Sequence, residues 1–206
     1  METNINTEQK ILDVAEGLFL DKGFAMTTTT EIARRVGCNQ ALVHYYFRTK
    51  ENLFEKLFEK KFLLFTSAIT LNNQKTKGLK DKIEDIITKH LDVIAANPKL
   101  PFLIINEITT NQDKFRNILE KLKEESATLL KMLDKELNIE IEKGTIRKIS
   151  SFDLLLNILS LNIFMFVAKP MLLGVKNFTP KEFDEFVLKR REEVFRTVWG
   201  GICINK

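Results

Sequence analysis

One short stretch, residues 27–50, constrains the fold more than any other part of this 206-residue chain. Thr28 with Glu31 three residues later is a helix start signal, because the threonine side chain can accept a hydrogen bond from the Glu31 N–H. Gly37 follows the apolar spacing and is the residue type that most easily adopts the left-handed conformation closing a helix. Asn39 can then cap a second helix. The stretch therefore predicts two short helices joined by a tight turn, a helix-turn-helix.

The second of these helices has two unlike faces. Val43 and Phe47 are four residues apart, so they share one face and point back toward the first helix. The residues left facing elsewhere are polar, aromatic or large: Gln40, Leu42, Tyr45 and Tyr46. A helix of this size fits the major groove of DNA.

Charge supports contact with a polyanion. The stretch 27–50 has one acidic residue, Glu31, and four basic ones: Arg34, Arg35, Arg48 and Lys50. Its excess of three positive charges compares with a net charge of +4 for the whole chain. Neutralised phosphates supply most non-specific DNA affinity, so the local excess matters more than the total. A helical hairpin with a solvated basic face is the alternative, but cap, glycine turn, apolar spacing and basic bias coincide here.

Composition favours an all-α fold. Apolar residues make up 44% of the chain and charged residues 29%, as in a folded globular protein, and there are only 4 Pro and 8 Gly. Two cysteines, Cys38 and Cys203, argue against a disulfide scaffold or a four-ligand zinc site. Two histidines, His44 and His90, are too few for a histidine metal cluster. We therefore predict neither metal nor cofactor.

Helical periodicity and cap signals divide the chain into two domains. Residues 1–50 form a three-helix DNA-binding head, and residues 51–206 form a second helical domain. Outside the helix-turn-helix, we expect helices over residues 7–22, 49 to about 71, 79–96, 100 to about 110, 113–143, 150 or 151 to about 173, and 179–199, with a loop at 72–78.

The apolar run Phe152–Val167 is the one stretch that raises the question of a membrane. Polar residues interrupt it, it is short for a bilayer span, and Lys169-Pro170 follows it, so we interpret it as a buried helix. The N-terminus has no basic segment followed by an apolar core. We expect a cytoplasmic protein without membrane contact.

The head resembles the tetracycline-repressor (TetR) family of bacterial transcription regulators. The residues that carry the resemblance are Ala15, Phe19, Gly23, Phe24, Thr28, Ile32, Ala33, Gly37, Val43, Tyr46, Phe47, Lys50 and Leu53. The segment His44–Lys50 is similar to the aromatic-rich end of that family's recognition helix. The resemblance implies an all-α homodimer whose variable C-terminal domain binds a small ligand and thereby releases DNA.

The predicted function is a ligand-responsive DNA-binding regulator, a repressor released from a palindromic operator. Gln40 can bond bidentately to adenine, and Leu42 can touch a thymine methyl group. Simple solvation of Gln40, partial burial of Leu42 and packing of Tyr46 are the alternatives. The predicted DNA-binding residues are Thr28, Thr29, Arg35, Asn39, Gln40, Ala41, Leu42, His44, Tyr45, Tyr46 and Lys50.

The last two long helices are the predicted dimer interface. Residues 152–173 carry more apolar surface than one side of a helix can bury within a single chain. A second stripe continues on the final helix through Phe183, Val187, Val194 and Val198. Paired with their symmetry mates, these helices would form a four-helix bundle.

Isolated polar residues in the central apolar helices are the candidate ligand site. They are His90, Asn106, Glu107, Asn157 and Asn162. Ligand pockets are mostly apolar with a few placed polar groups, so this pattern favours an apolar or amphipathic effector. Each of these groups can instead be satisfied by protein or water in the core.

Two other classes of function compete with a regulator. An enzyme is disfavoured, because the chain has no phosphate-binding glycine loop, zinc spacing or nucleophile elbow. A helical protein-interaction adaptor without DNA-binding activity is the second alternative, and salt-dependent DNA binding would separate it from a regulator.

Overall fold

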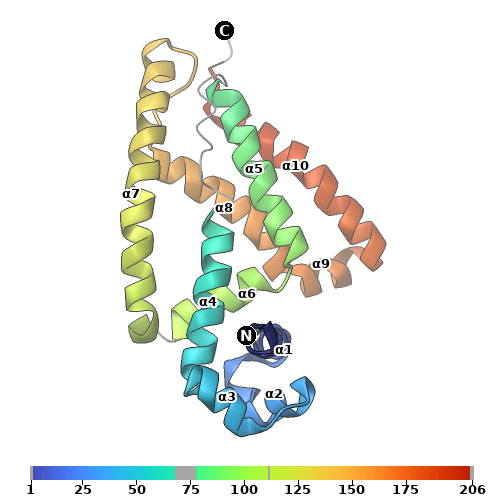
Figure 1. The fold of residues 1–206 in the computed structure, drawn as a ribbon. Helices are drawn as coiled ribbons and strands as arrows, with labels where there is room; N and C mark the ends of the chain where they lie inside the picture. Colours follow the sequence, from blue (N-terminus) through green and yellow to red (C-terminus); the bar gives the residue numbers. More distant parts are fainter. Residues whose placement is uncertain (1, 68–77, 111, 205–206) are drawn as a thin grey trace. The chain divides into compact units, whose positions relative to one another are not determined.

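The computed structural model describes residues 2–67, 78–110 and 112–204, and these contain ten α-helices (Figure 1). An isolated antiparallel bridge joins Ile146 and Cys203. The predicted all-α fold is confirmed. The chain forms two compact units, Met1–Leu63 and Leu64–Lys206, whose division falls inside α4 (Lys50–Ser67). We had placed the domain boundary after residue 50, at the start of α4, and that boundary stays a prediction.

The first unit is the head, made of α1 (Glu2–Met26), α2 (Thr29–Val36), α3 (Gln40–Phe47) and the first part of α4. Its core contains a cluster of aromatic rings, in which Phe54 lies 4.9 Å from Phe19 and 5.0 Å from Phe24 between ring centroids. Gly23 interrupts α1 with φ 75° and ψ 173°, and a last helical turn follows it. That break lets Phe24 fold back onto α1, where its ring stacks on that of Phe19 with centroids 6.0 Å apart.

The start of α4 is capped by a side chain. Thr49 Oγ1 accepts a hydrogen bond from the Asn52 N–H at 3.1 Å. The predicted continuation of this helix to Leu71 and most of the predicted loop 72–78 lie outside the described residues.

The second unit contains α5 (Leu79–Ala96), α6 (Leu100–Thr110), α7 (Gln112–Glu142), α8 (Ser151–Val167), α9 (Lys169–Lys176) and α10 (Pro180–Ile202). Helix α8 packs against α5, α6, α7 and α10, and α10 also packs against α5 (Figure 1). Ile158 of α8, Ile87 of α5 and Val194 of α10 are completely buried. Truncating one of these side chains to alanine would cost about 2–5 kcal/mol.

Helix α8 is shorter than predicted. We expected one helix to about residue 173, but it ends at Val167, and α9 continues after a bend of 66°. Pro170 explains the break, because it has no N–H to donate and its ring clashes with the carbonyl four residues earlier. None of the described helices is by itself long and apolar enough to cross a membrane. Among them, only the bent pair α8–α9 reaches that length and apolar composition when its two helices are counted as one segment.

Helix α10 begins as predicted and ends later. Thr179 Oγ1 accepts from the Glu182 N–H at 3.3 Å, and Glu182 Oε2 accepts from the Thr179 N–H at 2.8 Å, a complete capping box. The helix continues through both glycines at 200 and 201, past the predicted end at Trp199. The Arg147 N–H donates to Ile202 O at 2.8 Å, so the turn before α8 holds the end of α10.

The predicted interface stripe on α10 belongs to the core. Phe183, Val187, Val194 and Val198 are at most 6% exposed within a single chain. The period of the stripe was right, but its partners are α5 and α8 of the same chain.

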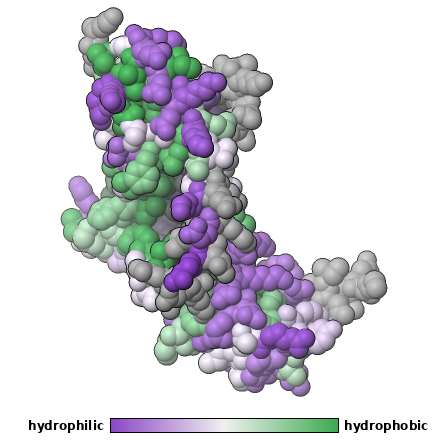
Figure 2. Space-filling model, turned by 90° about the vertical axis from the view of Figure 1, so that its left-hand side faces the viewer, coloured by the Kyte–Doolittle hydropathy of each residue, from purple (hydrophilic) through white to green (hydrophobic). Residues whose placement is uncertain are grey.

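Helix α8 exposes three large apolar side chains: Phe152 is 61%, Leu156 50% and Phe164 60% exposed. On the face of the second unit that Figure 2 shows, a broad apolar area is visible.

Candidate nucleic-acid interface

The turn between α2 and α3 is built at two helix ends. Thr28 Oγ1 accepts a hydrogen bond from the Glu31 N–H at 3.2 Å and begins α2. Gly37 closes α2 with φ 78° and ψ 31°, a left-handed conformation that residues with a Cβ rarely adopt. Asn39 Oδ1 accepts from the Ala41 N–H at 2.9 Å and begins α3. The predicted caps and glycine turn are confirmed.

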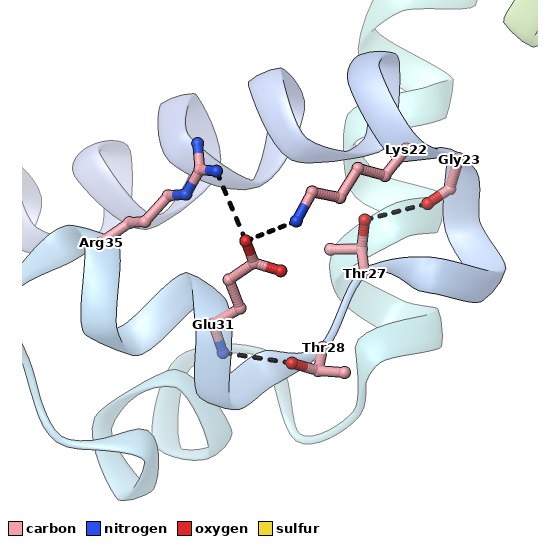
Figure 3. Close-up of polar contacts among 6 residues, drawn as sticks. All are labelled: Lys22, Gly23, Thr27, Thr28, Glu31 and Arg35. Atoms are coloured by element: carbon pink, nitrogen blue, oxygen red, sulfur yellow. Dashed lines mark hydrogen bonds and ion pairs between the residues drawn. The ribbon is translucent and has the colours of Figure 1, made fainter.

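The Glu31 carboxylate joins α2 to α1. Its Oε1 accepts from Lys22 Nζ at 2.7 Å and lies 3.4 Å from Arg35 Nη2 (Figure 3). The hydrogen bond from Lys22 is the largest effect that lowers the pKa of this carboxyl, and the charge of Arg35 adds to it. At the entry to α2, buried Thr27 donates to Gly23 O at 2.9 Å (Figure 3). These contacts fix the position of α2 on α1.

Helix α3 has one buried and one exposed side. Val43 is 1% and Phe47 4% exposed, so both pack into the head as predicted. On the other side Gln40, Ala41 and His44 are exposed. This exposed side gives α3 a surface that can meet DNA without disturbing the core.

Two threonines of α2 hold the side chain of Gln40. Gln40 Nε2 donates to Thr29 Oγ1 at 3.1 Å, and Thr30 Oγ1 donates to Gln40 Oε1 at 3.1 Å. Thr29 was among the predicted DNA-binding residues, and Thr30 was not. No spacing in the sequence distinguished Thr30 from its neighbours, because its role depends on the approach of α2 to α3.

The aromatic residues at the end of α3 differ in exposure. Tyr45 is 67% exposed, whereas Tyr46 and Leu42 are half-buried. The two tyrosine rings meet edge to face with centroids 5.3 Å apart. Tyr45 is therefore the more accessible hydroxyl for a phosphate oxygen.

Lys50 has a structural role. Its Nζ donates to Phe24 O at 3.0 Å and lies 4.2 Å from the centre of the Phe24 ring. These contacts tie the start of α4 to the exit of α1. A phosphate contact by Lys50, which stays a prediction, would have to replace them. Among the basic residues of the stretch, Arg34, Arg35 and Arg48 are exposed.

The structure brings two of the predicted ligand residues together. His90 of α5 and Asn162 of α8 are both completely buried. Asn162 Nδ2 lies 3.1 Å from His90 Nδ1 and donates to Ile87 O at 3.2 Å. Burial lowers the pKa of His90 to about 4, so its ring is neutral at pH 7.

The other three predicted ligand residues are not part of this pair. Glu107 of α6 is buried, at 4% exposed, whereas Asn106 beside it is exposed. Asn157 lies on the exposed side of α8. Of the five polar residues predicted from their place in apolar helices, three are therefore buried: His90, Glu107 and Asn162.

A groove of about 310 Å³ lies within the head, between α1 and α4. Glu8, Leu12, Lys56 and Lys60 are among its lining residues, and none of the predicted ligand residues is. Within the described ranges, no three His, Cys, Asp or Glu side chains are grouped so that they could hold a metal ion.

Known proteins share this head and fold. The family model described as bacterial regulatory proteins, tetR family, matches residues 11–57. The chain is 24% identical over 139 residues to the fatty acid metabolism regulator protein of Bacillus subtilis (strain 168), which covers 68% of this chain and 70% of that protein. It is 44% identical over 50 residues to the HTH-type transcriptional regulator QacR of Staphylococcus aureus (strain Mu50), covering 24% and 27% of the two chains.

Solved structures match over almost the whole length. A bacterial regulatory protein in the tetR family from Rhodococcus RHA1 aligns with a TM-score of 0.70 at 18% identity, covering 97% of this chain and 98% of that one. This likeness establishes the shared fold. By sequence, the alignments with five further curated relatives span only 25% to 56% of the length of those proteins.

Proposed function

Because the chain belongs to the TetR family of bacterial regulatory proteins and is a DNA-binding transcriptional regulator, we propose that it represses transcription from a near-palindromic operator. Regulators of this family act as dimers, and two copies of α3 would meet major grooves about 34 Å apart. The proposal includes no catalytic step and places the protein with its DNA target in the cytoplasm. A protein-interaction adaptor is the less supported alternative.

One observation carries the proposal: α3 buries Val43 and Phe47 and leaves Gln40, His44 and Tyr45 exposed. An amide at the start of a groove-entering helix can bond to the edge of adenine. Hydroxyls and guanidinium groups around it can bind phosphates and set the register.

The test begins with operator DNA selected from random genomic fragments by the wild-type protein. Gln40→Ala should weaken specific binding by about 1–3 kcal/mol and relax the preference at one base pair of each half-site. Arg34→Ala, at an exposed basic position, is the matched control and should weaken all sequences alike while reducing the salt slope by about 0.9. Unchanged base preferences in Gln40→Ala would exclude Gln40 from base recognition.

The proposed dimer interface uses the exposed side of α8. Besides its buried side, helix α8 exposes three large apolar side chains, and an exposed apolar patch of this kind marks an interaction surface. Its buried side contacts the rest of the unit, so the side with Phe152, Leu156 and Phe164 fits a second copy of the chain.

The proposed effector is an apolar or amphipathic molecule carrying a hydrogen-bond donor. Support comes from the buried pair His90 and Asn162 in an apolar surrounding, where Asn162 Oδ1 has no hydrogen-bond partner among the described residues. A buried acceptor of this kind favours a donor from a ligand. The Bacillus relative is named as a regulator of fatty acid metabolism, which agrees with an amphipathic class.

Effectors can be sought by thermal-shift screening and then titrated with and without operator DNA. An inducer must bind the DNA-free form more tightly, and coupling of about 1–3 kcal/mol is typical and reciprocal. Asn162→Leu should weaken the binding of such a compound. Asn157→Leu, at an exposed position of the same helix, is the control and should leave that binding unchanged. Equal affinity with and without operator would rule out induction by that compound.

A further inference from the structure

The Gln40 amide has a third polar neighbour besides its two threonines. Gln40 Nε2 lies 3.4 Å from Nε2 of His44, which is one turn further along the exposed side of α3. The orientation of the amide therefore depends on three groups: the hydroxyls of Thr29 and Thr30, and the imidazole of His44.

The tautomer of His44 follows from its other nitrogen. His44 Nδ1 lies 2.8 Å from the backbone carbonyl oxygen of Arg48, and a carbonyl oxygen can only accept. Nδ1 must therefore carry the proton of the neutral ring, and Nε2 must be an acceptor. The Arg48 N–H in turn donates to His44 O at 2.8 Å, so the backbone of Arg48, including the carbonyl that accepts from His44, is held at the closed end of α3.

The hydrogen-bonding capacity of Gln40 then divides unequally. Both amide hydrogens are engaged, one by Thr29 Oγ1 and one by His44 Nε2. Gln40 Oε1 accepts one hydrogen bond, from Thr30, and a carbonyl oxygen has two lone pairs. Among the described contacts, the amide therefore has one hydrogen-bonding position left, a lone pair on Oε1, and with it the Gln40 side chain can accept but not donate.

We propose that His44 is a positioning residue that sets which end of the Gln40 amide reads the base. With a neutral His44, Gln40 accepts from an exocyclic amino group, that of adenine or cytosine, in preference to bonding the acceptor edge of guanine. The inference rests on the proposed recognition role of Gln40.

The test measures base preference at the position that Gln40→Ala relaxes, by competition among operator variants at constant pH and ionic strength. The wild type should prefer adenine or cytosine at this position. His44→Gln, whose amide oxygen can accept from Gln40, should keep that preference. His44→Phe has no side-chain acceptor and should lose the preference by about five- to tenfold while keeping its salt slope.

The failures are distinguishable. A wild type that selects no operator contradicts the proposed function, and a Gln40→Ala protein with every preference intact removes the base contact on which the inference stands. If that contact exists but His44→Phe keeps the wild-type preference, or if His44→Gln loses it, His44 does not position Gln40. Thermal melts of each variant verify that the head is folded.

Discussion

Glu31 shows how a single carboxylate organises the head. Its pKa lies below the ordinary value of 4.5 because Lys22 donates a hydrogen bond to it. A folded-state pKa below the unfolded one means that the ionised group stabilises the fold at neutral pH, and that this contribution is lost as pH falls through the folded-state pKa. We expect Glu31→Gln to lower the melting temperature at pH 7, with the difference from wild type shrinking as the pH falls below 4.5 and through the lowered pKa. Glu55→Gln on α4 is the control, and a difference that stays the same throughout the pH series would contradict the assignment.

His90 makes the opposite kind of contribution. Its pKa is lowered to about 4 by burial, so protonation favours the unfolded chain, where the ordinary value is 6.5. Stability is complete above about pH 6.5 and falls as the pH drops toward 4, by about 1.4 kcal/mol per pH unit and roughly 3 kcal/mol in all. Urea unfolding at pH 7.5, 5.5 and 4.5 should show this slope in the wild type and a smaller one in His90→Gln.

At the scale of elements, local signals predicted what local interactions decide. The bounds of α5 and α6 and the caps at Thr28, Asn39 and Thr179 agree with the structure because each depends on residues a few positions apart. The predictions were wrong or incomplete where the structure depends on a partner that is distant in the sequence. Helix α8 is apolar on both sides, so its period could not show which side faces the core. Lys50 had no local signal for its bond to Phe24, 26 residues away.

The capping box of α10 gives a prediction at this scale. Thr179 accepts from the backbone of Glu182, and its own N–H and hydroxyl bind the Glu182 carboxylate and lower the pKa of that group. Thr179→Ala removes the side-chain half of the box and should lower the free energy of unfolding by about 1 kcal/mol. Thr179→Ser retains the hydroxyl and should stay near wild type. Urea unfolding monitored by circular dichroism measures both, and equal losses in the two variants would show that the hydroxyl is not the stabilising group.

For the whole molecule, the DNA-binding head and the proposed dimer face belong to different compact units. A substitution on α8 can therefore separate assembly from DNA contact. A monomer would keep one head with its basic charge and its non-specific, salt-dependent binding. It would lose the second half-site and with it most of the specific affinity, because both half-sites contribute to the same binding event.

We expect Leu156→Glu combined with Phe164→Glu to convert a dimer into a monomer. These side chains are 50% and 60% exposed in one chain, so their replacement spares the core, while a carboxylate buried between two copies would have no partner. Light scattering after gel filtration should give 23.9 kDa for the variant and twice that mass for the wild type. Val175→Glu on α9, at a position 72% exposed, is the control and should stay dimeric. A stable dimer carrying both α8 substitutions would place the interface elsewhere on the second unit, and an unchanged operator affinity in a proven monomer would contradict recognition by paired heads.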